Sequence, residues 1–413
     1  LAELTGAGGQ GEEELYRSLV QWLGGRHGER RSDVSAFLRQ LDAFDLGEYI
    51  RTIHFDELKV PTAPFQLPLS KTYYGLEEMR AGELDFLKAT VLGRSPDPVF
   101  LCSDMPMDDM AQDEDFKKKY MFGLAMLLKK GLRLNVVHNL DRPFPELMLG
   151  LQGWIPLYMT GQISPYYLKG VQNNVYCHFL NVSGSAALSG ECVAGAHAQG
   201  RYELVKGGEA LRYFRDRAAA IQRKALPLMD IYREDQAAAF RAFLASDARS
   251  AGARTRLLAS PPISTLREET LQAMLAARDL PLADCRRILE HAAAQRDRME
   301  TVLTHSPVSD AFPALTREEF ERYPPALPLS EMFFDRNLRY TYAEYCRHAE
   351  ETQAFAAAHS GYTVRPCDAA FRNISIAVRT GEWALVSKSG SPAIHFVIRY
   401  PKLRGAIEAF LCG

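Results

Sequence analysis

The spacing of apolar positions in the first half of the chain predicts helices that alternate with buried strands. Apolar residues three and four positions apart indicate a helix over 75–91, and the apolar run at 98–102 indicates a buried strand. A further helix is predicted to end before Gly131, and a second buried strand over 132–137. Because a strand–helix–strand order joins parallel strands, the pattern predicts an α/β fold.

The apolar pattern continues with one unusually apolar helix and a β region. The helix, predicted over 144–160, is apolar around much of its circumference, so we expect it to be buried or to form the subunit interface of a homodimer. Segments between 174 and 206 are punctuated by glycines and predict β-strands that are covered on both faces. A helix is expected to follow over 207–226.

The middle of the chain, residues 231–330, is rich in Ala and Arg and predicts a helical insertion. The predicted helices span 234–246, 265–278 and 282–303, and residues 255–260 are a possible strand between them. Acidic residues are interspersed with the arginines, which favours a solvated helical face over a nucleic-acid surface.

The pattern of residues 331–413 returns to helices and buried strands, as expected for a second α/β lobe. It predicts helices over 342–359 and 401–411 and strands over 374–378, 383–387 and 393–398. Gly and Pro between the last two strands predict a hairpin. With the first lobe at 56–230, the predicted fold class is α/β, with two lobes of mixed sheets flanked by helices.

Residues 1–55 are predicted to be a helical segment, with short helices over 12–24 and 32–47. The basic connector Arg26–Arg31 is interpreted either as a DNA-contacting turn or as a solvated link between packing helices. Gly6–Gly11 fits G-x-G-x-x-G, but no strand of sufficient length precedes it, so we interpret it as a flexible linker. Because the sequence begins at Leu1, a DNA-binding region could also lie N-terminal to it.

Composition and charge narrow the classes of function. The chain has 413 residues, of which 47% are hydrophobic and 24% are charged, as in ordinary globular proteins. Lys and Arg number 49 against 51 Asp and Glu, so the net charge of -2 does not indicate an extended nucleic-acid surface. The sequence contains no apolar run as long as a membrane span and no signal-peptide pattern, so a cytoplasmic protein without membrane contact is predicted.

Cysteine spacing and known motifs exclude several kinds of site. The seven cysteines are scattered and include no C-x-x-C pair, which predicts reduced thiols and argues against zinc, so no metal or cofactor is expected. Cys177 and His178 cannot act as a catalytic pair on a strand, because adjacent side chains point to opposite faces. The sequence also lacks the P-loop, H-E-x-x-H and G-x-S-x-G motifs.

Polar residues follow directly after the two predicted parallel strands. Asp104 follows the first strand, and His138, Asp141 and Arg142 follow the second. Because ligands bind at the carboxyl ends of parallel strands, this placement predicts a ligand-binding site. Two alternatives remain open: His138 could be a satisfied strand-end histidine, and Asp141 with Arg142 could cap the next helix and form a local ion pair.

Further candidates for ligand binding are aromatic and basic. The tyrosines that could form a pocket wall, or else belong to the core, are Tyr158, Tyr166 and Tyr167. Lys388 lies at a strand end, His395 within a strand and Arg399 just past one. Together these three could bind an anion, and otherwise they are edge and cap residues.

The sequence from His138 to Tyr167 carries a family resemblance. H-N-L-D-R, followed by E-L-M-L-G-L-x-x-W-I-P-L-Y-M-T-G-x-I-x-P-Y-Y, resembles transcriptional regulators of Clostridia-type Firmicutes, in which a short helix-turn-helix precedes a large uncharacterised region. K-T-Y-Y-G at 71–75, S-D-M-P-M at 103–107 and the closing N-I-S-I-A-V and V-S-K-S-G-S-P-A-I-H-F-V-I also match, so the resemblance covers most of residues 55–413. It implies a role in transcription regulation.

The order of helices and strands also resembles the two-lobed phospholipase D-like fold. An active member of that family carries H-x-K in each lobe, but none of the ten histidines here has Lys two residues later. The resemblance therefore implies a cleft that binds without cutting, as in bacterial regulators that use this fold as a sensor domain.

These observations support three hypotheses of function. The first is a non-catalytic ligand-sensing or effector region of a bacterial transcriptional regulator, a homodimer that binds a small-molecule or anionic ligand. DNA would bind through residues 1–55 or a region before them. The second is a phosphodiesterase-like or nucleotide-processing hydrolase, in which His138 acts as nucleophile or base and Arg142 holds phosphate. The third is a protein-interaction scaffold that uses the helical residues 231–330.

Overall fold

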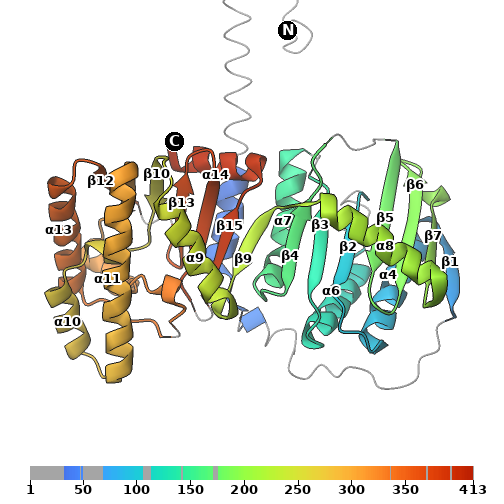
Figure 1. Ribbon diagram of the computed structural model, residues 1–413, viewed down its shortest axis with the longest axis horizontal. Helices are drawn as coiled ribbons and strands as arrows, with labels where there is room; N and C mark the ends of the chain where they lie inside the picture. The colour runs from blue at the N-terminus through green and yellow to red at the C-terminus, as the bar shows by residue number, and fades with distance from the viewer. Residues whose placement is uncertain are drawn as a thin grey trace, which may run out of the picture. The chain divides into compact units, whose positions relative to one another are not determined.

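The computed structural model describes residues 32–46, 48–49, 68–105, 113–140, 143–170, 175–334, 336–368, 371–390 and 393–412 (Figure 1). The predicted site residues Asp141 and Arg142, the predicted helix over 12–24 and the connector Arg26–Arg31 lie outside these ranges. The chain divides into two compact units. We call Phe44–Ile231 the 44–231 unit, and Tyr232–Gly413 together with Leu1–Ala43 the C-terminal unit.

The 44–231 unit is built on an eight-stranded mixed sheet with the strand order β1-β7-β6-β5-β2-β3-β4-β8. Its strands are β1 (Ser70–Tyr74), β2 (Val99–Ser103), β3 (Leu134–His138), β4 (Ile163–Tyr167), β5 (Tyr176–Val182), β6 (Ala187–Val193), β7 (Arg201–Val205) and β8 (Leu226–Pro227). Its helices are α4 (Gly75–Leu92), α6 (Glu114–Lys129), α7 (Phe144–Tyr158), η2 (His197–Gln199) and α8 (Gly208–Lys224). Neighbouring strands β2, β3 and β4 are parallel, and the other pairs are antiparallel.

The two faces of this sheet are covered by different helices. On one face, Phe100, Val137 and Leu180 pack against α8. The crossover helices α6 and α7, together with α4, lie on the other face (Figure 1). Asp113 begins α6 by accepting hydrogen bonds from the backbone N–H groups of Asp115 and Phe116, at 3.0 and 2.9 Å. Asp113 is therefore the N-cap of α6, where a carboxylate also complements the helix dipole.

The C-terminal unit is built on a seven-stranded mixed sheet with the strand order β12-β11-β10-β13-β14-β15-β9. Its strands are β9 (Met229–Tyr232), β10 (Arg254–Leu257), β11 (Val308–Pro313), β12 (Tyr362–Cys367), β13 (Ile374–Arg379), β14 (Trp383–Lys388) and β15 (Ile394–Ile398). Its helices are an unlabelled helix at 32–43, η3 (Glu234–Gln236), α9 (Ala237–Ala248), η4 (Ile263–Thr265), α10 (Glu268–Ala276), α11 (Leu282–His305), α12 (Arg317–Arg322), η5 (Ser330–Met332), α13 (Tyr342–Ala358) and α14 (Pro401–Cys412). Phe240 and Leu244 of α9 pack on Trp383 and Leu385 of β14.

The predicted fold class is confirmed, since two mixed sheets are flanked by helices. The predicted parallel pairing of β2 with β3 and the predicted hairpin of β14 with β15 are also confirmed. The stretch 231–330, predicted as a helical insertion, contains helices α9 to α12. It also contributes β10 and β11, which lie inside the second sheet.

Several strands were not predicted from the apolar pattern, and β4 shows why. Its Ser164 and Pro165 follow Gly161 and look like a turn, yet they pair with Asn135 and Val136 of β3. Pro165 is tolerated there because β8 pairs only with Tyr166 and Tyr167, so the missing N–H breaks no bond of that ladder. Likewise, β1, β11 and β12 carry polar residues that interrupt the alternation of apolar and polar positions expected of a strand.

Candidate functional site

The carboxyl ends of β2, β3 and β4 bring part of the predicted site together. His138 pairs with Ser103 on one side and with Tyr167 on the other. Nε2 of His138 lies 2.8 Å from the hydroxyl of Tyr158, and its ring meets Trp154 edge-on at 5.5 Å. Tyr158 is only 1% exposed, and this burial raises its pKa well above the usual value. Its hydroxyl therefore stays protonated and can donate a hydrogen bond to His138.

Tyr167 shares the face of His138, whereas the predicted residues Tyr166 and Asp104 lie on the opposite face of the sheet. Tyr166 and Cys102 pack into the apolar cluster beside α8. Asp104 lies 3.4 Å from Nδ1 of His178. Burial and the charge of Asp104 raise the pKa of Cys102 to about 12, so this thiol stays protonated. The structure therefore divides the predicted strand-end residues between two faces of one sheet.

Lys388 of the predicted anion site supports a helix end instead. Its Nζ donates to the backbone carbonyls of Leu41 and Asp42, at 2.7 and 2.8 Å. These carbonyls belong to the last turn of the helix at 32–43, where a cation complements the helix dipole. The carboxylate of Asp42 in turn accepts from the backbone N–H groups of Asn373 and Ile374 at the start of β13, so this helix end is held on both sides.

His395 and Arg399 lie on the sheet face opposite Lys388, under α9. His395 is fully buried, stacks on Phe240 at 4.1 Å and lies 2.9 Å from the hydroxyl of Ser387. Burial lowers its pKa to about 4, so it is neutral at physiological pH. The guanidinium of Arg399 lies 5.4 Å from the ring of Phe243. The structure does not join Lys388, His395 and Arg399 into one anion site.

The same sheet face carries charged residues that the sequence analysis did not single out. In the strand register, Arg254 of β10 lies opposite Arg379 of β13, and Arg379 lies opposite Trp383 of β14. Arg256 of β10 lies opposite Asp310 of β11. Side chains at directly opposed positions share a face, so three arginines converge beneath α9 and α11. Charges in such a place need partners, because leaving them unpaired away from water is costly.

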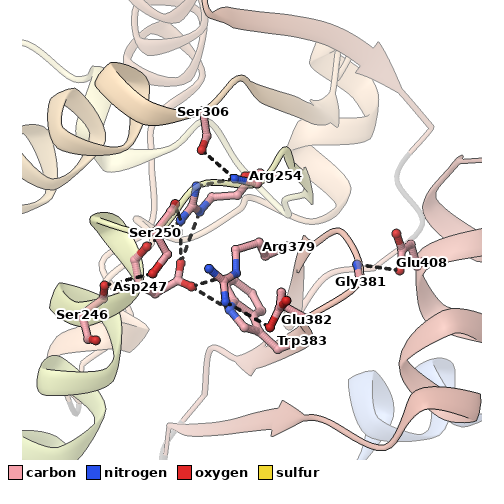
Figure 2. A network of polar contacts seen from close by, with 11 residues as sticks. Ser246, Asp247, Ser250, Arg254, Ser306, Arg379, Gly381, Glu382, Trp383 and Glu408 are labelled. Carbon is pink, nitrogen blue, oxygen red and sulfur yellow. Dashed lines mark hydrogen bonds and ion pairs between the residues drawn. The ribbon is translucent and has the colours of Figure 1, made fainter.

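Asp247 of α9 is the partner of Arg254, Arg379 and Trp383 (Figure 2). Its Oδ2 accepts from Nη2 of Arg254 at 2.9 Å, and its Oδ1 accepts from Nε1 of Trp383 at 2.8 Å. Nε of Arg379 lies 3.2 Å from Oδ1, close enough for an ion pair but without the alignment of a hydrogen bond. Figure 2 shows how one carboxylate ties α9 to three strands.

Asp310 of β11 is the partner of Arg256. It is 0% exposed, and its two oxygens accept from Nε and Nη2 of Arg256 at 2.6 and 2.5 Å. The hydroxyl of Tyr362 donates to the same carboxylate at 2.6 Å. A bidentate pair of this kind fixes the plane of the guanidinium as well as its position.

Glu331 fixes a fourth arginine, Arg298, at the edge of this face. Its Oε2 accepts from Nη2 of Arg298 and from Nε2 of Gln295, both at 2.6 Å. Burial alone would raise the pKa of Glu331, but the charges of Arg298 and His291 and these hydrogen bonds hold it at about 2. Glu331 is therefore ionised at neutral pH and orients Arg298.

A small cavity of about 80 Å³ lies among these groups, with Arg254, Arg256 and Arg298 in its wall. Ser264 also lines it, is 4% exposed, and has a hydroxyl oxygen without a hydrogen-bond partner among the described residues. A polar cavity of this size has room for a few water molecules or a small polar group.

A larger groove of about 620 Å³ runs along α9 and α11 and shares Gln295, Arg298 and Glu331 with the cavity. The charged residues and the histidine in its wall are Arg241, Arg249, Arg287, Glu290, His291, Asp297, Arg298 and Glu331. The side chains of Arg241 and Arg249 form no ion pair or hydrogen bond with any described residue. The groove therefore offers guanidinium groups that are available to an anion.

The groove did have a signal in the sequence. Arg241 and Ala245 of α9 and its C-cap residue Arg249 recur at intervals of about one helical turn, and so do Arg287, His291 and Gln295 along α11. Residues at this spacing share one side of a helix. The acids interspersed with the arginines favour a solvated face, because the sequence does not show that the two stripes lie beside one groove.

Comparisons with known proteins yield only distant likenesses. The chain matches no family model and no curated protein. One similar solved structure is titled "Structure of TrmBL2, an archaeal chromatin protein, shows a novel mode of DNA binding", with 10% identity, 52% of this chain and 70% of that chain covered, and a TM-score of 0.30. Another is a polyphosphate kinase from Porphyromonas gingivalis, with 9% identity, 84% and 53% covered, and a TM-score of 0.24.

No helix in the described part of the chain is both long and apolar enough to span a membrane. The apolar helix α7 is instead packed within its own unit, where Met148, Leu151 and Ile155 are buried.

Proposed function

We propose that this chain is the non-catalytic effector region of a bacterial transcriptional regulator, and that its C-terminal unit binds an anionic small molecule between α9 and α11. The observation that carries the proposal is the pair of unpartnered arginines, Arg241 and Arg249, in the wall of the groove. The role in transcription rests on the sequence resemblance, which also places DNA contact within residues 1–55 or before them and favours a homodimer.

The size and chemistry of the groove suit a ligand that carries phosphate or carboxylate. Its volume of about 620 Å³ lies within the usual range for small-molecule sites. Guanidinium groups bind such anions with two parallel hydrogen bonds, and Arg298 is already oriented by Glu331. A ligand that contacts arginines of both helices would stabilise the packing of α9 on α11, because binding energy adds to the stability of the bound form.

The test is binding of defined anions to the full chain. We expect the melting temperature to rise with at least one of inorganic phosphate, pyrophosphate, AMP and citrate. Arg249→Gln and Arg287→Gln should each weaken that binding about tenfold, since each removes a hydrogen bond to a charged group. Arg286→Gln is the matched control, because Arg286 is exposed on α11 but does not line the groove.

Two results would count against this proposal. If none of the four anions changes the melting temperature, the groove is not a site for this class of ligand. If Arg286→Gln weakens binding as much as Arg287→Gln, the attraction comes from the general charge of α11.

A phosphodiester hydrolysis assay distinguishes this proposal from the alternative, a hydrolase that uses His138. We expect no hydrolysis of a phosphodiester by the full chain. Hydrolysis that is lost in His138→Ala would contradict the non-catalytic proposal, because it would assign chemistry to the end of β3.

A further inference from the structure

Three side chains with soft donor atoms meet on the 44–231 unit. Cys177 of β5 and Cys192 of β6 are direct partners across an antiparallel pair, so their side chains share one face of the sheet. His197 of η2 joins them, and the two sulfur atoms and a ring nitrogen of the histidine all lie within 4.8 Å of one another. We propose that these residues bind a thiophilic metal ion, Zn²⁺ or Cu⁺.

The distances nearly fit a bound ion without rearrangement of the chain. Zn–S bonds are about 2.3 Å and Zn–N bonds about 2.0–2.1 Å, so donor atoms around one tetrahedral ion are separated by roughly 3.5–3.8 Å. Donors within 4.8 Å therefore need to move by about 1 Å at most to ligate one ion. Rotation of the Cys and His side chains is sufficient for that.

The backbone already holds the third ligand over the two cysteines. After β6 the chain turns through Gly195, which has a φ of 79°, a conformation that favours glycine. The N–H of Ala196 donates to the carbonyl of Val193 at 2.9 Å, and the N–H of Gly200 donates to the carbonyl of His197 at 3.0 Å. This turn returns His197 to the cysteine pair and positions it before any ion binds.

The surroundings favour a soft ion over a hard one. Cys177 and Cys192 are 8% and 5% exposed, and Sδ of the buried Met105 lies 3.8 Å from Sγ of Cys192. Thiolate, thioether and imidazole donors select Zn²⁺ or Cu⁺ over Mg²⁺ and Ca²⁺, which prefer oxygen. Met105 is a possible fourth ligand for Cu⁺, whereas Zn²⁺ would complete its shell with water.

Binding and proton release can be written without a redox step. Each coordinating thiol loses its proton to solvent as its S–metal bond forms, and the neutral imidazole contributes a lone pair. The sequence did not predict this site, because two cysteines on facing strands and a histidine after a turn do not show zinc-ligand spacing. The site belongs to the 44–231 unit and does not depend on the proposed anion groove.

The experiment is a metal titration of the reduced, chelator-stripped full chain. One arm uses Zn²⁺ against a chromophoric chelator, with Co²⁺ absorption as the signature of thiolate ligation, and the other arm uses Cu⁺. We expect one ion per chain to bind in at least one arm. Cys192→Ser and His197→Gln should each weaken binding by more than about 100-fold, beyond the loss typical of groups that only orient a ligand.

Cys102→Ser is the matched control, because Cys102 lies on the neighbouring strand β2 but packs on the α8 face. It should bind metal like the unchanged chain. His197→Gln alters a partly exposed residue, so it keeps the test valid if Cys192→Ser does not fold. Absence of binding in both arms, equal loss in Cys102→Ser, or a Cys177–Cys192 disulfide in place of metal would each overturn the proposal.

Discussion

The two units have similar frameworks and very different interiors. Each is a mixed sheet flanked by helices, yet the C-terminal unit buries carboxylates and guanidinium groups under α9 and α11. At the strand ends of the 44–231 unit, His138 hydrogen-bonds to Tyr158, and the ionisable pair of Asp104 and His178 is partly exposed to solvent. A shared architecture therefore does not decide where charge is placed.

The difference shows what each interior can be used for. A buried ion pair contributes little net stability, because the desolvation of both charges offsets their attraction, but removal of one partner is very costly. Such pairs hold Arg254 and Arg256 in fixed positions beside the cavity. The hydrogen bond of His138 is made with the uncharged hydroxyl of Tyr158, so it is cheaper to lose. The charged face of the C-terminal unit is accordingly the stronger candidate for a built recognition surface.

The largest expected effect is on the charged face. Asp310→Ala should lower the free energy of unfolding by about 3–5 kcal/mol, because it leaves Arg256, whose side chain is only 21% exposed, without its bidentate partner. Urea unfolding of the full chain would measure the loss in the transition that belongs to the C-terminal unit. The double variant Arg256→Met with Asp310→Leu removes both charges and should cost far less. Equal losses in the single and double variants would show that packing, and not charge, explains the effect.

The second-largest expected effect is a loss of folding stability at acid pH, and it should also arise in the C-terminal unit. Burial lowers the pKa of His348 and of His395 to about 4, against about 6.5 in an unfolded chain. Between pH 6.5 and 4 the unfolded state binds more protons, so stability falls as pH falls, by up to about 3 kcal/mol for each histidine. Above pH 6.5 both states carry neutral imidazoles and the effect is absent.

The acid prediction has a matched pair of variants. His395→Gln should reduce the slope of stability against pH between pH 6.5 and 4.5, a window above the titration of Glu331. His305→Gln changes an exposed residue of α11 and should leave the slope unchanged. A slope that is the same in all three proteins would mean that other groups control acid unfolding.

The smallest expected effect is on the hydrogen bond between Tyr158 and His138. Tyr158→Phe removes the 2.8 Å hydrogen bond to His138 and keeps the ring, so it should cost about 1 kcal/mol. Chemical denaturation monitored by circular dichroism would measure it. A loss as large as that of Asp310→Ala would erase the contrast between the two units.

The sequence predicted the framework well where burial was simple. Strands such as β2 and β3 are covered on both faces, so their apolar runs identify them, and the crossover between them identifies their parallel pairing. It failed where a polar side chain is buried with a partner far away in the sequence. Asp310 breaks the apolar run of β11, and only its contacts with Arg256 and Tyr362 explain why it lies inside.

The candidate sites could be predicted only in part for the same reason. The sequence placed His138 at the carboxyl end of a parallel strand, and the structure puts it there beside Tyr167. It could not show that Tyr166 and Tyr167 lie on opposite faces of the sheet, or that Lys388 supports the end of the helix at 32–43. The groove and the Cys177–Cys192 pair need the register of strands and helices, which local patterns do not contain.

Hydrogen exchange of the full chain, with and without saturating pyrophosphate, tests the central claim most directly. The account predicts slower exchange of backbone amides in α9 and α11, and no change at the carboxyl ends of β2, β3 and β4. Arg249→Gln should remove the protection and Arg286→Gln should retain it. Protection confined to the segment around His138, with α9 and α11 unchanged, would contradict the assignment of the ligand site to the C-terminal unit.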